Sequence, residues 1–339
     1  MRSSILATAV VVALFLPWSA PTTGAAPAAP RPVEVGQVAG LQDVLLRDGA
    51  VLVRAAAGDY LIVSLPDGKL GLAPVPPAEK IPIPADIIPH SAIVPGALDI
   101  KAVWLAGPTA RYDHGVLGDA IEAAALKVET GAGKILTYQL PANSVFEDLT
   151  PRLADLDGDG HDEIVVVRSS AGAGAAVAVL GIRDDKLDLV AESPAIGLAY
   201  RWLNPVGAGD FDGDGKKDIA VVQTPHLGGV LILYRIEGDR LVEFARQTGY
   251  STHAIGSTVL GMAAVLDLDG DGADDILLPD QTRRELLGIG YADGKFRVLW
   301  TVLNRDRIVT SVVIADVDGN GIPDVLYGLN DGSVRMLPR

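Results

Sequence analysis

The chain has 339 residues, of which 49% are hydrophobic and 21% charged, so it can fold around a large core and is too apolar to be disordered. Its formal net charge of −15 argues against nucleic acid and anionic membranes as partners, because both require clustered Lys and Arg. The sequence contains no cysteine, which excludes disulfides, a thiol nucleophile and the lipid anchor of a lipoprotein.

The first residues are predicted to form a secretory signal peptide over residues 1–25. Arg2 provides a positive charge, an apolar run follows over residues 5–18, and small residues precede a cleavage position after Ala25. The run is shorter than the roughly 20 residues that span a bilayer. We therefore expect export to the periplasm or the medium, with no transmembrane span in the mature chain; a retained anchor is the alternative.

A Pro/Ala-rich linker is expected over residues 26–32, before a single domain over residues 33–339. The domain begins with short apolar segments separated by turn residues, which is typical of strands. The predicted strands of this first unit are residues 43–46, 51–54, 60–64 and 70–74.

A second unit is indicated by residues 126–140, LKVETGAGKILTYQL, which predict a hairpin. The segment before it, residues 119–128, fits either a helical turn or the beginning of a strand. A loop in phase with the later units would occupy residues 91–99, SAIVPGALD, which keeps only Gly96 and Asp99 of the later pattern. We expect this unit to bind no metal ion, because the earlier carboxylates of that pattern are missing.

One nine-residue pattern then recurs four times, each time between two short apolar segments rich in β-branched residues. The copies are DLDGDGHDE at residues 155–163, DFDGDGKKD at 210–218, DLDGDGADD at 267–275 and DVDGNGIPD at 316–324. A hairpin pattern lies between successive copies, so each unit has four strands.

Six such units predict an all-β fold, a β-propeller of four-stranded blades. The last unit ends at Arg339 without a fourth strand, and residues 33–38 would supply it and close the ring. Six blades are preferred and seven are possible. A linear stack is disfavoured, because its end units would need polar caps.

The recurring pattern is typical of a metal loop. Carboxylates at positions 1, 3, 5 and 9 can point to one centre, glycine at position 6 permits a sharp turn, and oxygen ligands at this density select calcium. A plain Asp-Gly turn is the alternative. Four copies favour metal, because carboxylates crowded at the same positions repel one another unless a cation neutralises them. An EF-hand is excluded, because it requires Glu at position 12 and helical flanks.

The arrangement of strand, D-x-D-x-D-G-x-x-D/E and strand resembles the FG-GAP and VCBS repeats of calcium-binding β-propellers, similar to the integrin α-chain head. The resemblance covers residues 155–339 and, without a Phe-Gly and Gly-Ala-Pro signature, is closer to VCBS repeats. It implies about four structural calcium ions, with the fourth bound least tightly because Asn320 replaces a carboxylate. The ligands, with the backbone carbonyl of His161 added, are Asp155, Asp157, Asp159 and Glu163; Asp210, Asp212, Asp214 and Asp218; Asp267, Asp269, Asp271 and Asp275; and Asp316, Asp318, Asn320 and Asp324.

If strands alternate in direction, the metal loops share one face with the hairpin turns, and the remaining loops meet on the opposite rim. Candidate ligand-binding residues on this rim are Arg111, Tyr112, His114, Arg201, Trp202, His226, Tyr250 and His253. Exposed Tyr, Trp and Arg side chains suit recognition. The alternative for each His on this rim is a structural role, as a loop residue that is hydrogen-bonded to the backbone. The chain lacks an H-x-x-x-H spacing, a G-x-S-x-G elbow and a phosphate-binding Gly-rich loop.

We expect a calcium-stabilised monomer that acts as a non-enzymatic scaffold or binding module for a protein or a glycan. The alternative is a secreted carbohydrate hydrolase or lyase, which requires a carboxylate pair or a base on this rim. Glu147 and Asp148 are the adjacent acidic residues there, and we interpret them as ordinary loop charges. Glu147 together with His226 and His253 around one point would favour the enzyme.

Overall fold

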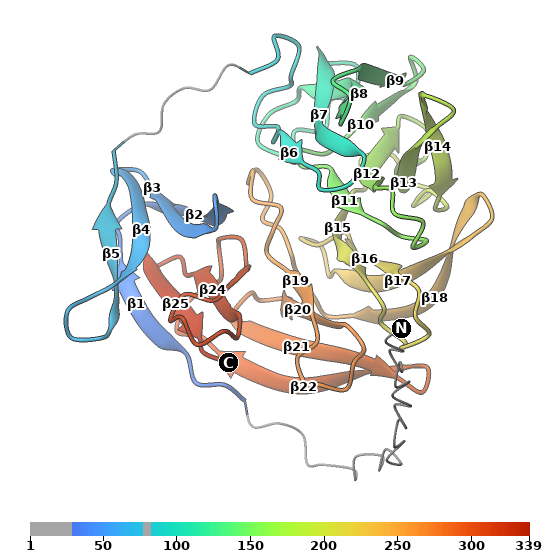
Figure 1. Ribbon diagram of the computed structural model, residues 1–339. Helices are drawn as coiled ribbons and strands as arrows, with labels where there is room; N and C mark the ends of the chain where they lie inside the picture. Colours follow the sequence, from blue (N-terminus) through green and yellow to red (C-terminus); the bar gives the residue numbers. More distant parts are fainter. Residues whose placement is uncertain (1–28, 77–82) are drawn as a thin grey trace, which may run out of the picture.

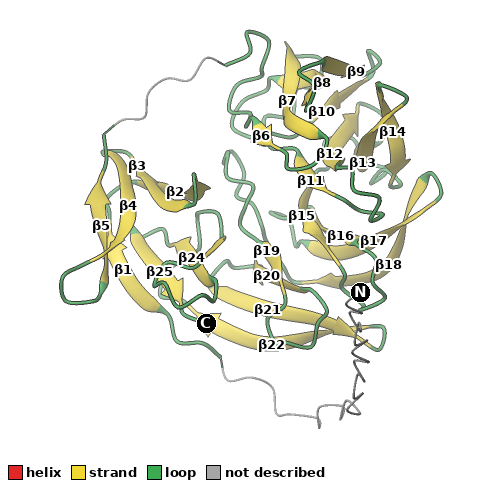
Figure 2. Cartoon of the chain, viewed as in Figure 1, coloured by secondary structure: helices red, strands yellow, loops and turns green. Residues whose placement is uncertain are grey.

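The structure is a computed structural model that describes residues 29–76 and 83–339. The described residues form 25 β-strands and contain no helix, which confirms the all-β class (Figure 2). Within this described part, no helix exists that is long and apolar enough to span a membrane. The predicted signal peptide and the first residues of the predicted linker lie outside the described residues.

The first unit is a four-stranded antiparallel sheet in which neighbours along the chain pair with one another. Its strands are β2 (Leu41–Arg47), β3 (Ala50–Ala55), β4 (Gly58–Ser64) and β5 (Leu70–Pro74). Asp48 and Gly49 both have positive φ in the tight β2–β3 turn, at 51° and 76°, which matches the right-handed twist of the two strands. All four strands that the sequence predicted for this unit are present.

The second, third and fourth units are joined edge to edge in one 13-stranded sheet. The second unit contains β6 (Val94–Pro95), β7 (Ile100–Thr109), β8 (Glu122–Thr130) and β9 (Ile135–Gln139). The third contains β10 (Ser144–Phe146), β11 (Arg152–Ala154), β12 (Glu163–Ser170), β13 (Gly174–Arg183) and β14 (Lys186–Glu192). The fourth contains β15 (Leu203–Gly209), β16 (Asp218–Gln223), β17 (Val230–Glu237) and β18 (Arg240–Thr248). Of the two readings of residues 119–128, the strand is the observed one.

The fifth and sixth units are separate four-stranded sheets. The fifth contains β19 (Ala264–Leu266), β20 (Asp275–Pro279), β21 (Glu285–Ala292) and β22 (Lys295–Leu303). The sixth contains β23 (Val313–Ala315), β24 (Asp324–Gly328), β25 (Ser333–Leu337) and, from the other end of the chain, β1 (Val33–Gln37). β1 pairs antiparallel with β25, as the sequence predicted, so the first described strand completes the last unit.

The six units follow one another around a common centre, and the first unit lies next to the last (Figure 1). Apolar side chains pack between several neighbouring units: one core cluster joins β2 and β3 to β24 and β25, another joins the fourth unit to the fifth, and a third joins the fifth to the sixth. Burial of these apolar faces is the main favourable free energy that holds the units together. The loops at the two ends of the strands are therefore held on a rigid base.

Candidate metal loops and the opposite rim

Four acidic loops connect strands of the third to the sixth unit: β11 to β12, β15 to β16, β19 to β20 and β23 to β24. In each loop, one oxygen atom from each of three carboxylates lies within 4.8 Å of the other two. The groups are Asp155, Asp157 and Glu163; Asp210, Asp212 and Asp214; Asp267, Asp269 and Asp271; and Asp316, Asp318 and Asp324. This spacing is compatible with one metal ion in each loop.

The first Asp of each loop shapes the backbone around it. The carboxylate of Asp155 accepts hydrogen bonds from the backbone N–H groups of Gly158, at 2.7 Å, and Gly160, at 3.1 Å. The glycine at position 6 donates to the first Asp in the other three loops too. Gly158 and Gly160 have φ of 78° and 86°, a region that L side chains rarely adopt. The sequence pattern thus folds each loop so that its carboxylates converge.

The residue at position 9 begins the strand that follows each loop and is buried in all four loops, as Glu163, Asp218, Asp275 and Asp324. Burial, with smaller contributions from the nearby loop carboxylates, raises the pKa of Asp218 and of Asp275 to about 7. Burial also raises the pKa of Glu163 and Asp324. A bound cation would reverse this effect, because it favours the ionised form of each carboxyl group.

The second loop differs from the others because Arg235 of β17 reaches into it. The Arg235 guanidinium donates a hydrogen bond to Asp212 at 2.7 Å and lies 3.6 Å from Oδ2 of Asp218. The guanidinium also stacks over the ring of Phe244, 4.3 Å from its centroid. Oδ2 of Asp218 is buried and has no hydrogen-bond partner in the described residues. This unsatisfied oxygen fits a loop whose acceptors are arranged for a cation.

On the opposite rim, the structure buries half of the predicted ligand-binding residues. Tyr112, Trp202, Tyr250 and His253 are each at most 2% exposed, so the expectation that the Tyr and Trp side chains of this rim are exposed is wrong. Their aromatic rings pack between loops, where apolar burial outweighs contact with a ligand. The remaining four are exposed or half-buried and are Arg111, His114, Arg201 and His226.

Glu147 lies at the centre of a buried network beneath this rim. Its carboxylate accepts hydrogen bonds from Ser169 and contacts Nδ1 of His114, and its backbone carbonyl accepts a hydrogen bond from the Trp202 indole at 2.8 Å. Glu147 and Asp148 are both fully buried, so their interpretation as ordinary loop charges is wrong. Burial raises the pKa of Glu147, while His114 and Ser169 lower it.

A polar cavity of about 500 Å³ lies further along the same rim, between loops of the fourth, fifth and sixth units. We call it the rim cavity. It brings His226 and His253 together, with ring centroids 5.9 Å apart, but Glu147 does not line it. The residues that line it are Pro225, His226, Gly228, Ser251, His253, Ala254, Ile255, Gln281, Thr282, Arg283 and Arg307. The sequence analysis did not identify Arg283 and Arg307. The basic stretch TRR at residues 282–284, within an acidic chain, is the signal that could have identified Arg283.

The model of the FG-GAP-like repeat matches the chain three times, over residues 155–221, 210–278 and 267–327. The chain belongs to the FG-GAP-like repeat family. Each match begins at the first Asp of an acidic loop and extends through the following hairpin to the next loop and the strand beyond it. The FG-GAP-like repeat is therefore the structural unit that carries the loops.

Three solved structures similar to this FG-GAP-like protein are rhamnogalacturonan lyases. YesW is 16% identical with a TM-score of 0.35 and matches 88% of this chain and 60% of its own. The enzyme of Bacillus licheniformis is 19% identical with a TM-score of 0.36, again matching 88% of this chain and 60% of its own. The exotype lyase YesX is 13% identical with a TM-score of 0.42 and matches 89% and 66%. The chain thus spans less than two thirds of the length of each lyase. A search of curated proteins finds no match.

Not every predicted ligand of the FG-GAP-like repeats belongs to the three-oxygen groups. In the first loop the group contains position 9 in place of position 5, and the reverse holds in the second and third loops. In the fourth loop position 5 is Asn320, and the three carboxylates are those of positions 1, 3 and 9. A carboxylate oxygen of Asp159 instead accepts a hydrogen bond from the His161 backbone at 2.9 Å. The side chain of His161 turns away from the loop, with Nδ1 3.2 Å from the Asp99 carboxylate of the neighbouring unit.

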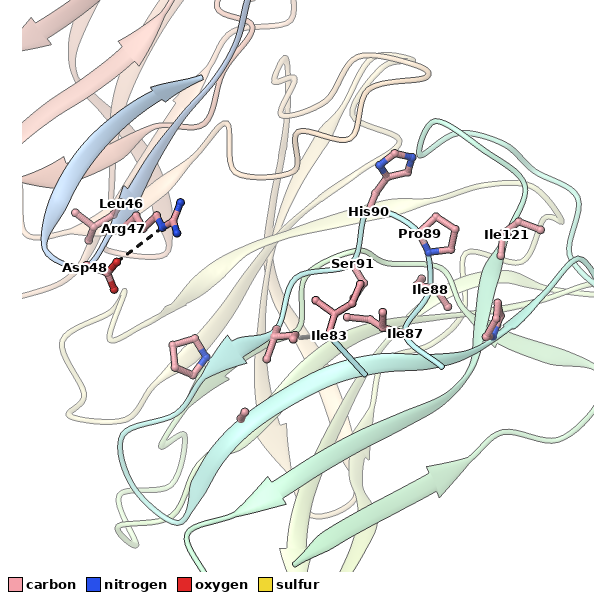
Figure 3. Close-up of a pocket in the computed structure, with 14 residues that line it drawn as sticks. Leu46, Arg47, Asp48, Ile83, Ile87, Ile88, Pro89, His90, Ser91 and Ile121 are labelled. Atoms are coloured by element: carbon pink, nitrogen blue, oxygen red, sulfur yellow. Dashed lines mark ion pairs between the residues drawn. The ribbon is translucent and has the colours of Figure 1, made fainter. Parts of the chain in front are cut away.

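A larger cavity of about 1100 Å³ lies between the first and second units of the FG-GAP-like chain (Figure 3). Its walls are the β2–β3 turn around Leu46 and an apolar segment that includes Ile87 and Ile88. Arg47 and Asp48 pair with each other at 3.7 Å, and both side chains are exposed. Most of the lining is apolar, and His90 is also part of it.

Proposed function

We propose that the chain is an exported, calcium-stabilised, six-bladed β-propeller that acts as a non-enzymatic recognition module for a protein or a glycan. Its loops with carboxylates would hold the metal, and its opposite rim would bind the partner. The sequence supports export through the apolar run before Ala25.

Six blades are supported by six units of paired strands in the described residues, the last of which is completed by β1. Closing a ring by pairing the two ends of the chain is a common way to protect the edge strands of a propeller. Gly332 contributes to this closure, because its carbonyl accepts a hydrogen bond from the Val38 backbone at 2.9 Å.

Calcium is the metal that the donor set favours. The loops offer carboxylate and backbone oxygens and no sulfur or imidazole inside the three-oxygen groups, and hard oxygen donors select calcium over zinc or copper. Four divalent ions would also offset part of the net charge of −15. The ions would be structural, because each loop joins two paired strands, at the opposite strand ends from the loops that line the rim cavity.

The observation that carries the recognition role is the composition of the rim cavity: it contains exposed and half-buried cationic groups but no carboxylate among the described lining residues. Glycoside hydrolysis normally requires two carboxyl groups that reach the substrate. Glu147, the candidate that the sequence singled out, is fully buried and contacts His114 and Ser169. These contacts favour binding over hydrolysis, and the sugar-release assay below separates a binding module from a lyase.

Thermal unfolding tests the metal part of the proposal. With dissociation constants of roughly 10⁻⁴ to 10⁻³ M, millimolar calcium stabilises by about 0.4 to 1.4 kcal/mol per site. Calcium should therefore raise the Tm of the wild type measured after EDTA treatment. The double variant Asp157→Ala, Asp212→Ala should lose about half of this rise. Asp188→Ala, at an exposed position of β14 outside the loops, should keep it.

Incubation of the purified protein with soluble polysaccharides tests the recognition part. We expect retention of at least one glycan, or capture of a protein partner, without release of smaller sugars. Release of sugar fragments by the wild type and not by Glu147→Gln would overturn the non-enzymatic proposal in favour of the enzyme.

A further inference from the structure

The rim cavity contains two guanidinium groups without an acidic partner. Arg283 and Arg307 both line it, and neither forms an ion pair with any residue in the described part of the chain. The nearby Asp280 carboxylate is already occupied, because it accepts hydrogen bonds from the backbone of Thr282 and Arg284. Other described arginines also form no ion pair, but here two guanidinium groups line one cavity without a lining carboxylate, so the cavity is a local concentration of positive charge in a chain with 43 acidic and 28 basic residues.

The backbone fixes one of these arginines in place. Arg283 has a φ of 60°, in a region that is costly for a residue with a side chain. Its backbone N–H donates to the Asp280 carbonyl at 2.9 Å, and its own carbonyl accepts from the Ile308 N–H at 2.7 Å. Two backbone hydrogen bonds thus hold a strained residue whose side chain lines the cavity. Strain of this kind is concentrated at binding sites.

Three nitrogen atoms of the lining are buried and have no hydrogen-bond partner among the described residues: Nδ1 of His226, Nδ1 of His253 and Nη1 of Arg283. His253 is only 1% exposed. Leaving such an atom unsatisfied costs about 1 to 3 kcal/mol. A ligand that supplies the missing partners would recover this free energy.

The two kinds of nitrogen require different partners. Arg283 offers a charge-assisted donor, which favours an oxyanion. Nε2 of His253 donates to the Ser257 carbonyl at 2.9 Å, so Nδ1 of the neutral ring is an acceptor. Burial lowers the pKa of His253 to about 4, which keeps the ring neutral at neutral pH. A complementary ligand therefore carries both an oxyanion and a hydroxyl group.

We propose that the rim cavity binds an acidic sugar, with Arg283 and Arg307 on its oxyanion and Nδ1 of His253 accepting a hydrogen bond from a neighbouring hydroxyl group. The volume of about 500 Å³ is within the range of small-molecule sites. A uronate and a sugar phosphate share this chemistry. The inference rests on the proposed recognition role of the rim and adds the class of ligand.

Isothermal titration calorimetry on the full calcium-loaded chain tests the proposal with D-glucuronate, D-glucose 6-phosphate, D-glucose and inorganic phosphate. We expect at least one acidic sugar to bind about 10- to 100-fold more tightly than glucose, the range expected for a charge-assisted hydrogen bond. The tighter of the two acidic sugars identifies the oxyanion as carboxylate or phosphate. Inorganic phosphate should bind more weakly than either, because it lacks the sugar hydroxyl groups.

Matched variants locate the binding. The double variant Arg283→Gln, Arg307→Gln should lose the preference for the acidic sugar, whereas Arg284→Gln, with an exposed side chain outside the cavity, should keep affinity within about twofold. Equal Tm values for the variants establish that they are folded. Equal binding of glucose and glucuronate, or an equal loss of affinity in Arg284→Gln, would overturn the proposal.

The two proposals fail differently. If the chain retains a neutral glycan or a protein but shows no preference for acidic sugars, the acidic-sugar inference is wrong and the recognition role stands. If the folded chain retains no glycan and captures no protein, the recognition role itself is wrong.

Discussion

Glu122 is predicted to hold its proton at neutral pH, at a measurable cost to stability. The residue begins β8 and is 1% exposed. Burial, followed by the nearby carboxylates of Glu147, Asp119 and Asp148, raises its pKa from 4.5 to about 9. In the unfolded chain the same group is ionised at pH 7. The Glu122→Gln variant is neutral and similar in shape at every pH, so it removes the difference between the two states.

The magnitude follows from the two pKa values. Between pH 4.5 and 9 the folded state binds more protons at Glu122 than the unfolded state does, so this group lowers the free energy of unfolding as the pH rises. Each pH unit contributes about 1.4 kcal/mol. At pH 7, which is 2.5 units above the unfolded value, the cost is about 3 kcal/mol. Glu122→Gln should be more stable than the wild type by about this amount at pH 7, and nearly equal to it at pH 4.5.

Urea unfolding at pH 5, 7 and 8.5, followed by tryptophan fluorescence at saturating calcium, measures this difference. The stability gained by the variant should grow with pH. Glu129→Gln is the control on the same strand: its side chain is 29% exposed and pairs with Lys101, so it should change stability by less than about 1 kcal/mol at every pH. A variant that is less stable than the wild type at pH 7, or whose advantage does not change with pH, would refute the reasoning.

Two further predictions concern ring closure and the second loop. A Cβ at Gly332, which has a φ of 87°, would lie 2.2 Å from the Val38 carbonyl oxygen, so Gly332→Ala should lower the free energy of unfolding in urea by at least about 2 kcal/mol. The control Gly133→Ala, with a φ of 80° but open space around the position, should lower it by only about 1 kcal/mol. Equal losses of stability in the two variants would contradict the role of the close contact. The guanidinium of Arg235 pairs with Asp212 and so competes with a metal ion for this carboxylate. Arg235→Gln should therefore raise the calcium affinity of the second loop about two- to fivefold in calorimetry. An unchanged affinity would mean that the guanidinium does not compete with the metal.

The sequence predicted the local structure of this protein well, because strands and tight turns depend on neighbouring residues. The segment 70–74 coincides with β5, and the loops fold around Asp155 and its equivalents through hydrogen bonds within nine residues. The pairing of β1 with β25 was also predictable, because the last unit lacked a strand. These features follow from alternation, glycine positions and strand counting.

The rim was predicted less well, because its geometry depends on how one unit packs against the next. Trp202 is buried by contacts with His253 and Glu147, from loops far apart in the chain. Arg283 and Arg307 converge from two different loops, and neither belongs to a motif. A loop residue can be assigned to a face of the fold from strand direction alone, but whether its side chain is exposed depends on long-range packing.

The degenerate loop of the second unit illustrates how a structural role can preserve part of a metal motif. The sequence kept only Gly96 and Asp99 of the pattern. The Asp99 carboxylate accepts a hydrogen bond from the Asp162 backbone at 2.8 Å and pairs with His161, both in the first acidic loop. A Cβ at Gly96 would lie 2.2 Å from the Ile100 carbonyl oxygen and 3.1 Å from an Asp162 carboxylate oxygen. These two residues are thus explained by the packing of one loop on the next, without a metal ion, whereas the carboxylates at positions 1, 3 and 5 have no such role and are absent from this unit.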